Sequence, residues 1–306
     1  MSTVVVKEKK LKSKGMPVDL SEKVITVIAY IFVTLLTLIA LLPCLHVISK
    51  AFSNGSAVIS GKVYFWPVGI QLETISKVVT KTNLLRSIKN SLFVTVVGVT
   101  ASMLTSILFA YPLSKTDLKG RKFFIVICII SMVFNGGMVP KYIVMKTLGL
   151  LDSYLALILP HALSIFNMLI IKNYFEGLPE STMESAAIDG ANDVITLFKI
   201  VCPMALPVIA TVSLLYAVSY WNIYFSAVLY IKSSSMKVLQ VFLKDLISSA
   251  LSVSDSLITD PNVYSHISPD GVVACATVLA IIPIVALYPF IQRYMIKGIT
   301  IGSEKG

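Results

Sequence analysis

The residues that could do chemistry gather in one polar stretch, 177–201, between two strongly apolar segments. Acidic side chains alternate there with small ones: Glu184, Ala186, Ala187, Asp189 and Gly190. Alanine side chains let another surface approach closely, and a glycine can end a helix in a conformation that other residues resist. We interpret the stretch as a docking module on one membrane surface, with Glu184 expected to face a basic residue of the docked partner.

Local signals within this module predict two short helices. Ser181 precedes Glu184 by three residues, which is the spacing of a helix N-cap and its reciprocal carboxylate. Gly190 is then expected to end the first helix, and either Asn192 or Asp193 to cap a second one running to about Val201. The prediction is therefore a helix-turn-helix lying on the membrane face.

Patterns for catalysis, metal binding or nucleotide binding are weak elsewhere. The segment from Gly55 to Val63 approaches a phosphate-binding loop, but its spacing is one residue too long and Val63 has no hydroxyl for magnesium. The histidines and cysteines form no metal-ligand spacing: His46, His161, His266, Cys44, Cys128, Cys202 and Cys275. We expect no cofactor or metal in this chain, so any ATP and magnesium would be bound by a separate polypeptide.

The last polar candidates lie in an apolar segment and could contact a substrate. Tyr216, Tyr220 and Tyr224 recur every four residues, so in one helix they would share a face. Trp221 and Asn222 stand beside them. Aromatic faces stack on sugar rings, and an amide can donate to and accept from hydroxyl groups. The open alternative is a belt of aromatic residues at the membrane interface.

Composition requires a membrane around these residues. The chain of 306 residues is 56% hydrophobic and only 14% charged, with a mean hydropathy of +0.84, far from the average of soluble domains. The net charge of +10 arises largely from clusters beside apolar segments, which determine topology rather than bind nucleic acid. We therefore expect an all-α polytopic membrane protein, with the lipid bilayer as its surroundings.

Six segments are long enough to cross about 30 Å of hydrocarbon, which takes roughly 20 residues. They are Val24–Ile48, Ser91–Leu113, Phe123 to about Met138, Tyr154–Ile171, Pro203–Ile231 and Gly271–Met295. The third is interrupted between Asn135 and Pro140 by glycines and a proline, which break helices. We expect either a short tilted span that ends near Met138 or a span that unwinds there, followed by a surface helix from Lys141 to Leu150. Segments 49–90 and 232–270 are predicted to be extramembrane loops.

Basic residues beside the spans predict the orientation. Six lysines lie in residues 1–23 and four lysines or arginines in 115–122, which favours the cytoplasm for both segments. The predicted organisation is a basic cytoplasmic tail (1–23), a transmembrane domain (24–295) and a cytoplasmic C-terminal tail (296–306), in a bacterial cell membrane. An even number of spans then also places the 177–201 module in the cytoplasm.

The same module carries a family resemblance. Glu184-Ser185-Ala186-Ala187-Ile188-Asp189-Gly190-Ala191, with Phe198, Ile200, Pro203 and Pro207 behind it, resembles the coupling motif of bacterial ABC importer permeases. Within them it is most similar to the carbohydrate-uptake branch, typified by the smaller permease of the maltose transporter. Ser185 stands where alanine is common, and Cys202 where leucine often precedes Pro203. Further likeness lies at Leu148-Gly149-Leu150, Trp221-Asn222 and Gln292 to Gly298, so it covers most of the chain from about residue 85.

This resemblance implies a type I ABC importer permease fold with six transmembrane helices and a cytoplasmic coupling helix between spans four and five. It implies a homologous second permease, two copies of a cytoplasmic ATPase that bind ATP and magnesium, and an extracellular substrate-binding protein. No catalysis is expected in this chain. The stretch from Phe134 to Pro140 also resembles permeases that handle complex oligosaccharides.

Two other functions remain as alternatives. An ion-coupled secondary carrier would be expected to hold ionisable residues inside the membrane or matched half-repeats, and neither is evident. Only Asp152 comes near a span, and the outer surface suits it better. A membrane-embedded enzyme acting on lipids or glycans would need an acidic or histidine-rich loop, and the small-residue core of the 177–201 module suits packing better.

Overall fold

The computed structural model describes residues 20–134, 136–256 and 268–303, and these parts of the chain are helical, without β-strands. The first elements are α1 (Leu20–Phe52), α2 (Gly55–Ile59), α3 (Glu73–Lys81), α4 (Leu84–Ser114), α5 (Arg121–Val133), α6 (Met138–Thr147), α7 (Leu155–Ile158), η1 (Leu159–His161) and α8 (Ile165–Glu176). Then follow α9 (Glu180–Ile188), α10 (Asp193–Thr196), the π-helix η2 (Leu197–Val201), α11 (Cys202–Met204), α12 (Leu206–Trp221), α13 (Phe225–Tyr230), η3 (Ser234–Met236), α14 (Leu239–Ser256) and α15 (Pro269–Ser303).

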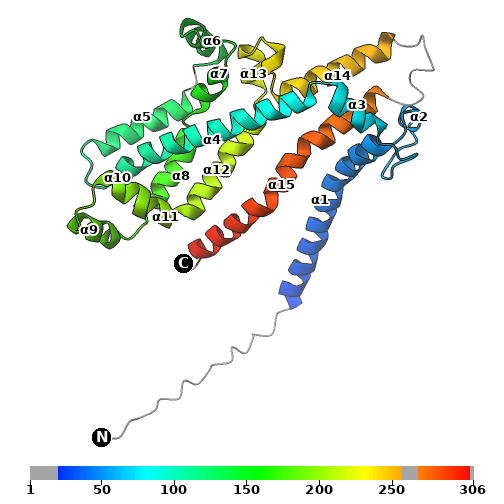
Figure 1. The fold of residues 1–306 in the computed structure, drawn as a ribbon. Coiled ribbons are helices and arrows are strands. Elements are labelled where there is room, and N and C mark those ends of the chain that lie inside the picture. The colour runs from blue at the N-terminus through cyan, green and yellow to red at the C-terminus, as the bar shows by residue number, and fades with distance from the viewer. Residues whose placement is uncertain (1–19, 135, 257–267, 304–306) are drawn as a thin grey trace.

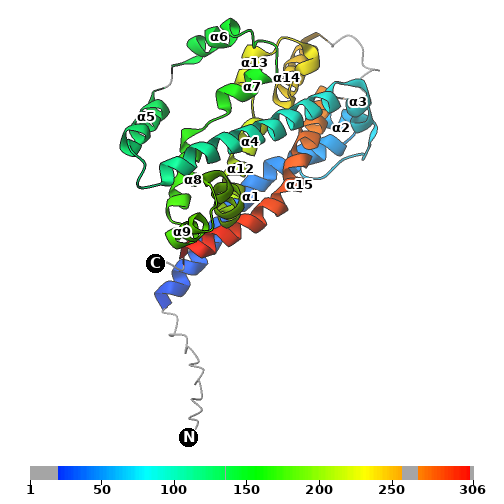
Figure 2. The ribbon, with the colours of Figure 1, turned by 60° about the vertical axis from the view of Figure 1, so that its left-hand side comes forward.

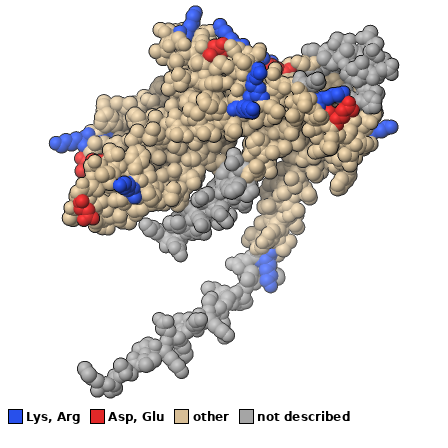
Figure 3. All heavy atoms as spheres, in the orientation of Figure 1, with Lys and Arg blue, Asp and Glu red and all other residues tan. Residues whose placement is uncertain are grey.

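Three described helices are long and apolar enough to cross a membrane on their own, within Lys23–Phe52, Leu84–Ser114 and Pro269–Ala286. Three bent pairs meet the same test together, which brings the number to six if each pair is one span. Charged side chains gather toward the two ends of the molecule and leave a broad uncharged band between them (Figure 3). Residues 1–19 of the predicted basic tail lie outside the described residues, and α15 continues through residues 296–303 of the predicted C-terminal tail.

Breaks within the bent pairs follow from the residues at them. α5 and α6 meet at 108° across the predicted interruption, where Gly137 adopts a positive φ of 79°. The predicted interruption is therefore confirmed, although the helix after it spans Met138–Thr147 rather than Lys141–Leu150. The pair formed by Asp193–Met204 and Leu206–Trp221 bends by 86°, beside Pro207, which lacks a backbone N–H and whose ring crowds the preceding turn.

The segment predicted as one span from about Pro203 to Ile231 is not a single helix. α12 ends at Trp221, and α13 begins only at Phe225. The Asn222 side chain donates its Nδ2–H to the carbonyl oxygen of Val218 at 2.9 Å, a local bond of the kind by which asparagine competes with helical structure.

The predicted loop 232–270 also contains an element that the prediction missed. α14 packs against α4 and α15, with Leu239 buried and three apolar neighbours at helical spacing packed beside it: Phe242, Leu243 and Leu246. This amphipathic pattern is the sequence signal that could have identified the helix. Segment 49–90 likewise contains α2 and α3.

Helix α4 is the central element. It packs against α8 and α12 on one side and contacts α14 and α7 further along (Figures 1 and 2). α1 and α15 pack along each other and form the other part of the molecule. α9, α10 and α11 lie at the same end as the start of α1 and the end of α15, whereas α2, α3 and α6 lie at the opposite end.

Small residues of α4 let α12 approach closely. Gly98, Ser102 and Ser106 repeat every four residues, and the two serines bond to tyrosine hydroxyls of α12. The Ser102 Oγ–Tyr220 Oη distance is 2.9 Å, and the Ser106 Oγ–Tyr216 Oη distance is 2.7 Å. Close packing and such hydrogen bonds hold helices together in lipid, where the hydrophobic effect between them is absent.

We predict that Gly98→Ala destabilises the protein by about 1–3 kcal/mol, because a well-packed interface tolerates added atoms poorly. An added Cβ at this position would lie 2.6 Å from Cζ of Tyr220. Thermal unfolding of the purified chain in detergent measures the effect, with Val97→Leu on the exposed face as control. Gly98→Ala combined with Tyr220→Ala should lose less than the sum of the single changes; full additivity would contradict the contact.

A second set of contacts closes the end of the molecule that carries α6 and α13. Asp152 has a positive φ of 59°, and its backbone N–H donates to the Tyr230 carbonyl at 2.8 Å. Its carboxylate accepts from the backbone N–H groups of Lys232 and Ser233 at 2.9 and 2.8 Å and from the Ser233 hydroxyl. These hydrogen bonds hold the pKa of Asp152 below its usual range. Asp152 thus joins the loop before α7 to the loop after α13.

We predict that Asp152→Asn lowers the thermal stability at neutral pH, because the amide accepts fewer hydrogen bonds than the carboxylate. The folded-state pKa of Asp152 is lowered, so its contribution is complete above the ordinary value of 3.8 and is lost as the pH falls through the folded-state value. The difference in unfolding temperature between wild type and Asp152→Asn should therefore shrink as the pH falls below the folded-state pKa of Asp152. Asp152→Gly also permits the positive φ, so it separates the effect of the carboxylate from that of backbone strain. If Asp152→Asn were as stable as wild type at neutral pH, the role of the carboxylate would be contradicted.

Candidate functional site: the α9–η2 module

The N-cap of α9, the first helix of the 177–201 module, is Pro179 and not Ser181. We call this module the α9–η2 module. Pro179 is the N-cap of α9 in an extended conformation, without a side-chain cap. Ser181 lies inside the helix, where its carbonyl accepts the hydroxyl proton of Ser185 at 2.8 Å. The predicted capping pair of Ser181 and Glu184 is therefore wrong. α9 therefore starts two residues, about half a turn, earlier than the serine suggests.

The end of α9 confirms the prediction for Gly190, which has a φ of +80°. The N–H of Ala191 donates to the Ala186 carbonyl at 2.9 Å, and the N–H of Gly190 donates to the Ala187 carbonyl at 3.1 Å. This pair of bonds is a Schellman motif, which satisfies the last carbonyls of a helix. An added Cβ at Gly190 would meet no atom within 4 Å, so the conformation, not space, requires glycine here.

The second helix is capped as predicted by Asn192. Its Oδ1 accepts the N–H of Ile195 at 2.9 Å, so of the two proposed caps the structure uses Asn192. From α10 the chain continues as η2 to Val201 and α11 to Met204. The predicted end near Val201 falls at the end of the π-helix.

α9 presents most of its surface to the outside. Ala186 is buried, whereas Glu184, Ala187 and Asp189 are exposed. Ile188 is 86% exposed, although it is the kind of residue usually found in a core. Glu184 forms no ion pair with the residues that the structure describes. Ile188 and the carboxylates of Glu184 and Asp189 therefore lie on the outer face of α9.

Charged groups join the ends of α4, α5 and α8 to one another just before the module begins. Glu176, at the end of α8, pairs with Lys172 one turn earlier and with Arg121 at the start of α5. Arg121 Nε also donates to the Leu113 carbonyl near the end of α4 at 2.9 Å. The Lys172 side chain is nearly buried, and its ammonium bonds to Glu176 and to Oδ1 of Asn173.

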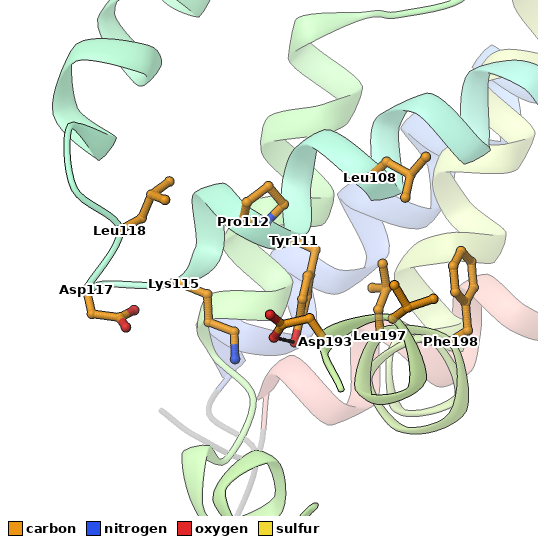
Figure 4. A pocket seen from close by; sticks show the side chains of 10 residues that line it. Leu108, Tyr111, Pro112, Lys115, Asp117, Leu118, Asp193, Leu197 and Phe198 are labelled. Atoms are coloured by element: carbon orange, nitrogen blue, oxygen red, sulfur yellow. Dashed lines mark hydrogen bonds between the residues drawn. The ribbon is translucent and has the colours of Figure 1, made fainter. Parts of the chain in front are cut away.

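A second set of contacts joins α4 to α10. The Tyr111 hydroxyl donates to Oδ1 of Asp193 at 3.4 Å, and the Lys115 ammonium lies 5.1 Å from the centre of the Tyr111 ring. Figure 4 shows these side chains beside a cavity of about 520 Å³ between α4 and η2, whose far wall includes Leu197 and Phe198. A neighbouring cavity of about 350 Å³ separates the 114–117 segment from Glu184 and Ala187 of α9. The module is thus held at its edges and leaves space behind it.

Sequence reasoning missed Tyr111, Lys115, Arg121 and Glu176 as parts of this site. Lys115 and Arg121 belong to the basic cluster interpreted above as a topology signal. Arg121 meets Glu176 across 55 residues and Tyr111 meets Asp193 across 82. Only the fold brings these pairs together, and no local pattern identifies them.

The five substrate-path candidates separate in the structure. Tyr216, Tyr220 and Trp221 are buried in the protein, with the two tyrosine hydroxyls bonded to α4 and to the 158–164 segment. Because α12 ends at Trp221, Tyr224 does not continue the face that Tyr216 and Tyr220 share, and that part of the prediction is wrong. Asn222 is exposed and Tyr224 partly buried, both at the break between α12 and α13.

Comparison with known proteins identifies the family. A model described as "Binding-protein-dependent transport system inner membrane component" matches residues 93–301. The chain belongs to this family. It is therefore a multi-pass membrane permease and not an enzyme, and the resemblance carried by the Glu184–Ala191 motif is confirmed.

Similar proteins cover nearly the whole chain. The polygalacturonan/rhamnogalacturonan transport system permease protein YtcP of Bacillus subtilis is 40% identical, over 94% of this chain and 100% of that protein. Protein LplC of the same organism is 40% identical, over 88% and 90%. A crystal structure of a bacterial ABC transporter involved in the import of the acidic polysaccharide alginate matches with a TM-score of 0.82 and 34% identity, over 90% of this chain and 98% of that one.

We predict that Gly190→Val loosens the end of α9, whereas Gly190→Asn preserves most of it. A positive φ costs an ordinary L-residue roughly 1–2 kcal/mol, asparagine adopts it more readily, and a β-branched residue resists it most. Hydrogen exchange of the Gly190 and Ala191 amides, which donate to α9 carbonyls, measures the effect. Equal protection in the two variants would contradict the assigned role of the glycine.

Proposed function

We propose that this permease forms one half of the membrane pathway of an ATP-driven importer for a sugar or oligosaccharide. The other half would be a homologous second permease. Two copies of a cytoplasmic ATPase would bind ATP and magnesium, and an extracellular substrate-binding protein would deliver the substrate. Membership of a binding-protein-dependent family supports this assembly in general terms. The printed names of relatives that handle polygalacturonan and alginate support a carbohydrate substrate.

The α9–η2 module is the proposed coupling element, with α9 as the coupling helix. The observation that carries the proposal is the exposed Ile188 on a short helix whose module contacts α4 through Lys115 and Tyr111. Arg121 and Glu176 join the end of α8, which leads into α9, to α4 and α5. Lys115 of α4 contacts Met183 of α9, and Tyr111 ties α10 to α4. A partner that grips α9 would therefore displace several spans together, and a helix closed by a Schellman motif transmits that displacement without fraying.

Six spans and a cytoplasmic module complete the proposal. If α12 is counted as the fifth span and each of the other two bent pairs as one span, the start of α1, the α9–η2 module and the end of α15 fall on one side, as their common end in the fold supports. The lysines in residues 1–23 and the basic cluster 115–122 belong to that same side, which favours the cytoplasm.

The substrate pathway is proposed to pass the break between α12 and α13. Asn222 is exposed there with an amide that suits sugar hydroxyls, and Tyr224 offers an aromatic face beside it. Tyr216, Tyr220 and Trp221 would contribute to the same wall by holding α12 in place, since their side chains are buried.

Ile188→Asp should weaken the grip of the ATPase. Loss of one well-buried apolar contact at an interface costs about 1.4 kcal/mol or more, which is roughly tenfold in affinity. The test is purification of the tagged permease from its native membrane, with the ATPase identified by mass spectrometry and quantified, alongside uptake of labelled oligosaccharides. Ser185→Ala, an exposed change on the same helix, is the matched control.

We also expect Gly190→Val to leave membrane insertion intact while uptake falls relative to ATP hydrolysis. Three outcomes would contradict the proposal. The purified complex could lack any ATPase, Ile188→Asp could retain it fully, or uptake could follow an ion gradient without ATP, as the secondary-carrier alternative requires.

A further inference from the structure

A short loop at the end of the molecule opposite the α9–η2 module carries an unusual set of exposed side chains. Residues 61–72 connect α2 to α3, and this segment contains six exposed large apolar residues and one exposed charge, Lys62. The exposed fractions reach 82% for Trp66 and 76% for Ile70. The other four are Tyr64, Phe65, Val68 and Leu72. We call these six residues the aromatic ledge. Such a concentration of apolar surface marks a contact with something other than water.

Hydrogen bonds to α1 and to the residues after it hold the backbone of the ledge in place, and its side chains face outward. The Tyr64 carbonyl lies 2.8 Å from Nδ1 of His46 on α1. The Val68 N–H donates to the Ser53 hydroxyl at 3.0 Å, and the Val68 carbonyl accepts the N–H of Asn54 at 3.0 Å. Val63, just before the ledge, is buried against α2. With the backbone held in this way, the side chains of the ledge stay on the outside of the protein.

The attachment to α1 fixes the depth of the ledge in a membrane. Every side chain from Lys23 to Leu45 of α1 is exposed, as expected of a lipid-facing span. At 1.5 Å per residue, about 20 residues after Lys23 cross the hydrocarbon, which ends close to Cys44. His46, and Tyr64 bound to it, then lie just beyond the hydrocarbon, at the level of the lipid headgroups. Tryptophan and tyrosine are enriched at that level, because their rings are apolar and their edges polar.

We infer that the aromatic ledge is a lipid-interface anchor, inserted among the headgroups of the leaflet opposite the α9–η2 module. Its apolar side chains continue the lipid-facing surface of α1 outward, and the ammonium of Lys62 suits lipid phosphates. A docked protein would more often meet a polar rim around an apolar centre, and Lys62 is the one charged residue in the segment 61–72. The anchor holds this end of α1 at a set depth. The inference does not depend on which leaflet faces the cytoplasm.

Trp66 provides the test, because the chain contains only two tryptophans and the other, Trp221, is buried. The full chain carrying Trp221→Phe is reconstituted in nanodiscs, so that fluorescence reports Trp66 alone. We expect blue-shifted emission, and quenching by brominated phosphatidylcholine that is strongest for bromine near the headgroup and weaker toward the chain end. Aqueous acrylamide should quench it less than it quenches free tryptophan.

A subtraction covers the case in which Trp221→Phe does not fold. The spectrum of the Trp66→Phe protein is subtracted from that of wild type, which leaves the contribution of the exposed Trp66 in an unaltered core. Water-like emission, full quenching by acrylamide and no quenching by brominated lipid would overturn the inference. It would also be overturned if Trp66 became shielded only when the substrate-binding protein is added, since the ledge would then be a protein-docking surface.

Discussion

The close approach of α4 and α12 is the contact on which the rest of the structure depends. In lipid, helices gain little from burying apolar surface against each other, so close packing and hydrogen bonds must hold them together. Gly98 admits the Tyr220 ring, and Ser102 and Ser106 bond to the hydroxyls of Tyr220 and Tyr216. The same hydroxyls reach the segment between α7 and α8. One helix face therefore positions three elements, and α4 carries this arrangement from one end of the molecule to the other.

The position of the α9–η2 module depends on this framework. The end of α4 supplies the Leu113 carbonyl, Tyr111 and Lys115, which contact α5, α10 and α9 respectively. Polar contacts suit this place because the spans end there and water and headgroups begin. The module is attached at its edges, has cavities behind it and leaves Ile188 outside. Such an element can move as a unit with the spans while its outer face stays available to a partner.

The opposite end of the molecule is organised by loops with satisfied backbones rather than by long helices. The Asp152 carboxylate accepts hydrogen bonds from the loop after α13. His46, Ser53 and Asn54 bind the backbone of the aromatic ledge. Exposing the apolar residues of the ledge to water would be energetically unfavourable. At the level of the headgroups they match their surroundings. Thus both ends of the protein use polar bonds to set the backbone and leave apolar side chains for what lies outside.

The sequence alone determined the features that depend on local physics. Hydropathy identified the membrane class and the apolar segments, and backbone preferences placed the break before Pro140, the Asn192 cap and the helix end at Gly190. Tertiary structure decided what depends on distant partners. It turned Tyr216 and Tyr220 toward α4, ended α12 at Trp221, packed α14 against α4 and α15, and paired Arg121 with Glu176. A residue's own neighbours in sequence specify its helix and its cap, but a contact across fifty or more residues exists only once the helices have packed.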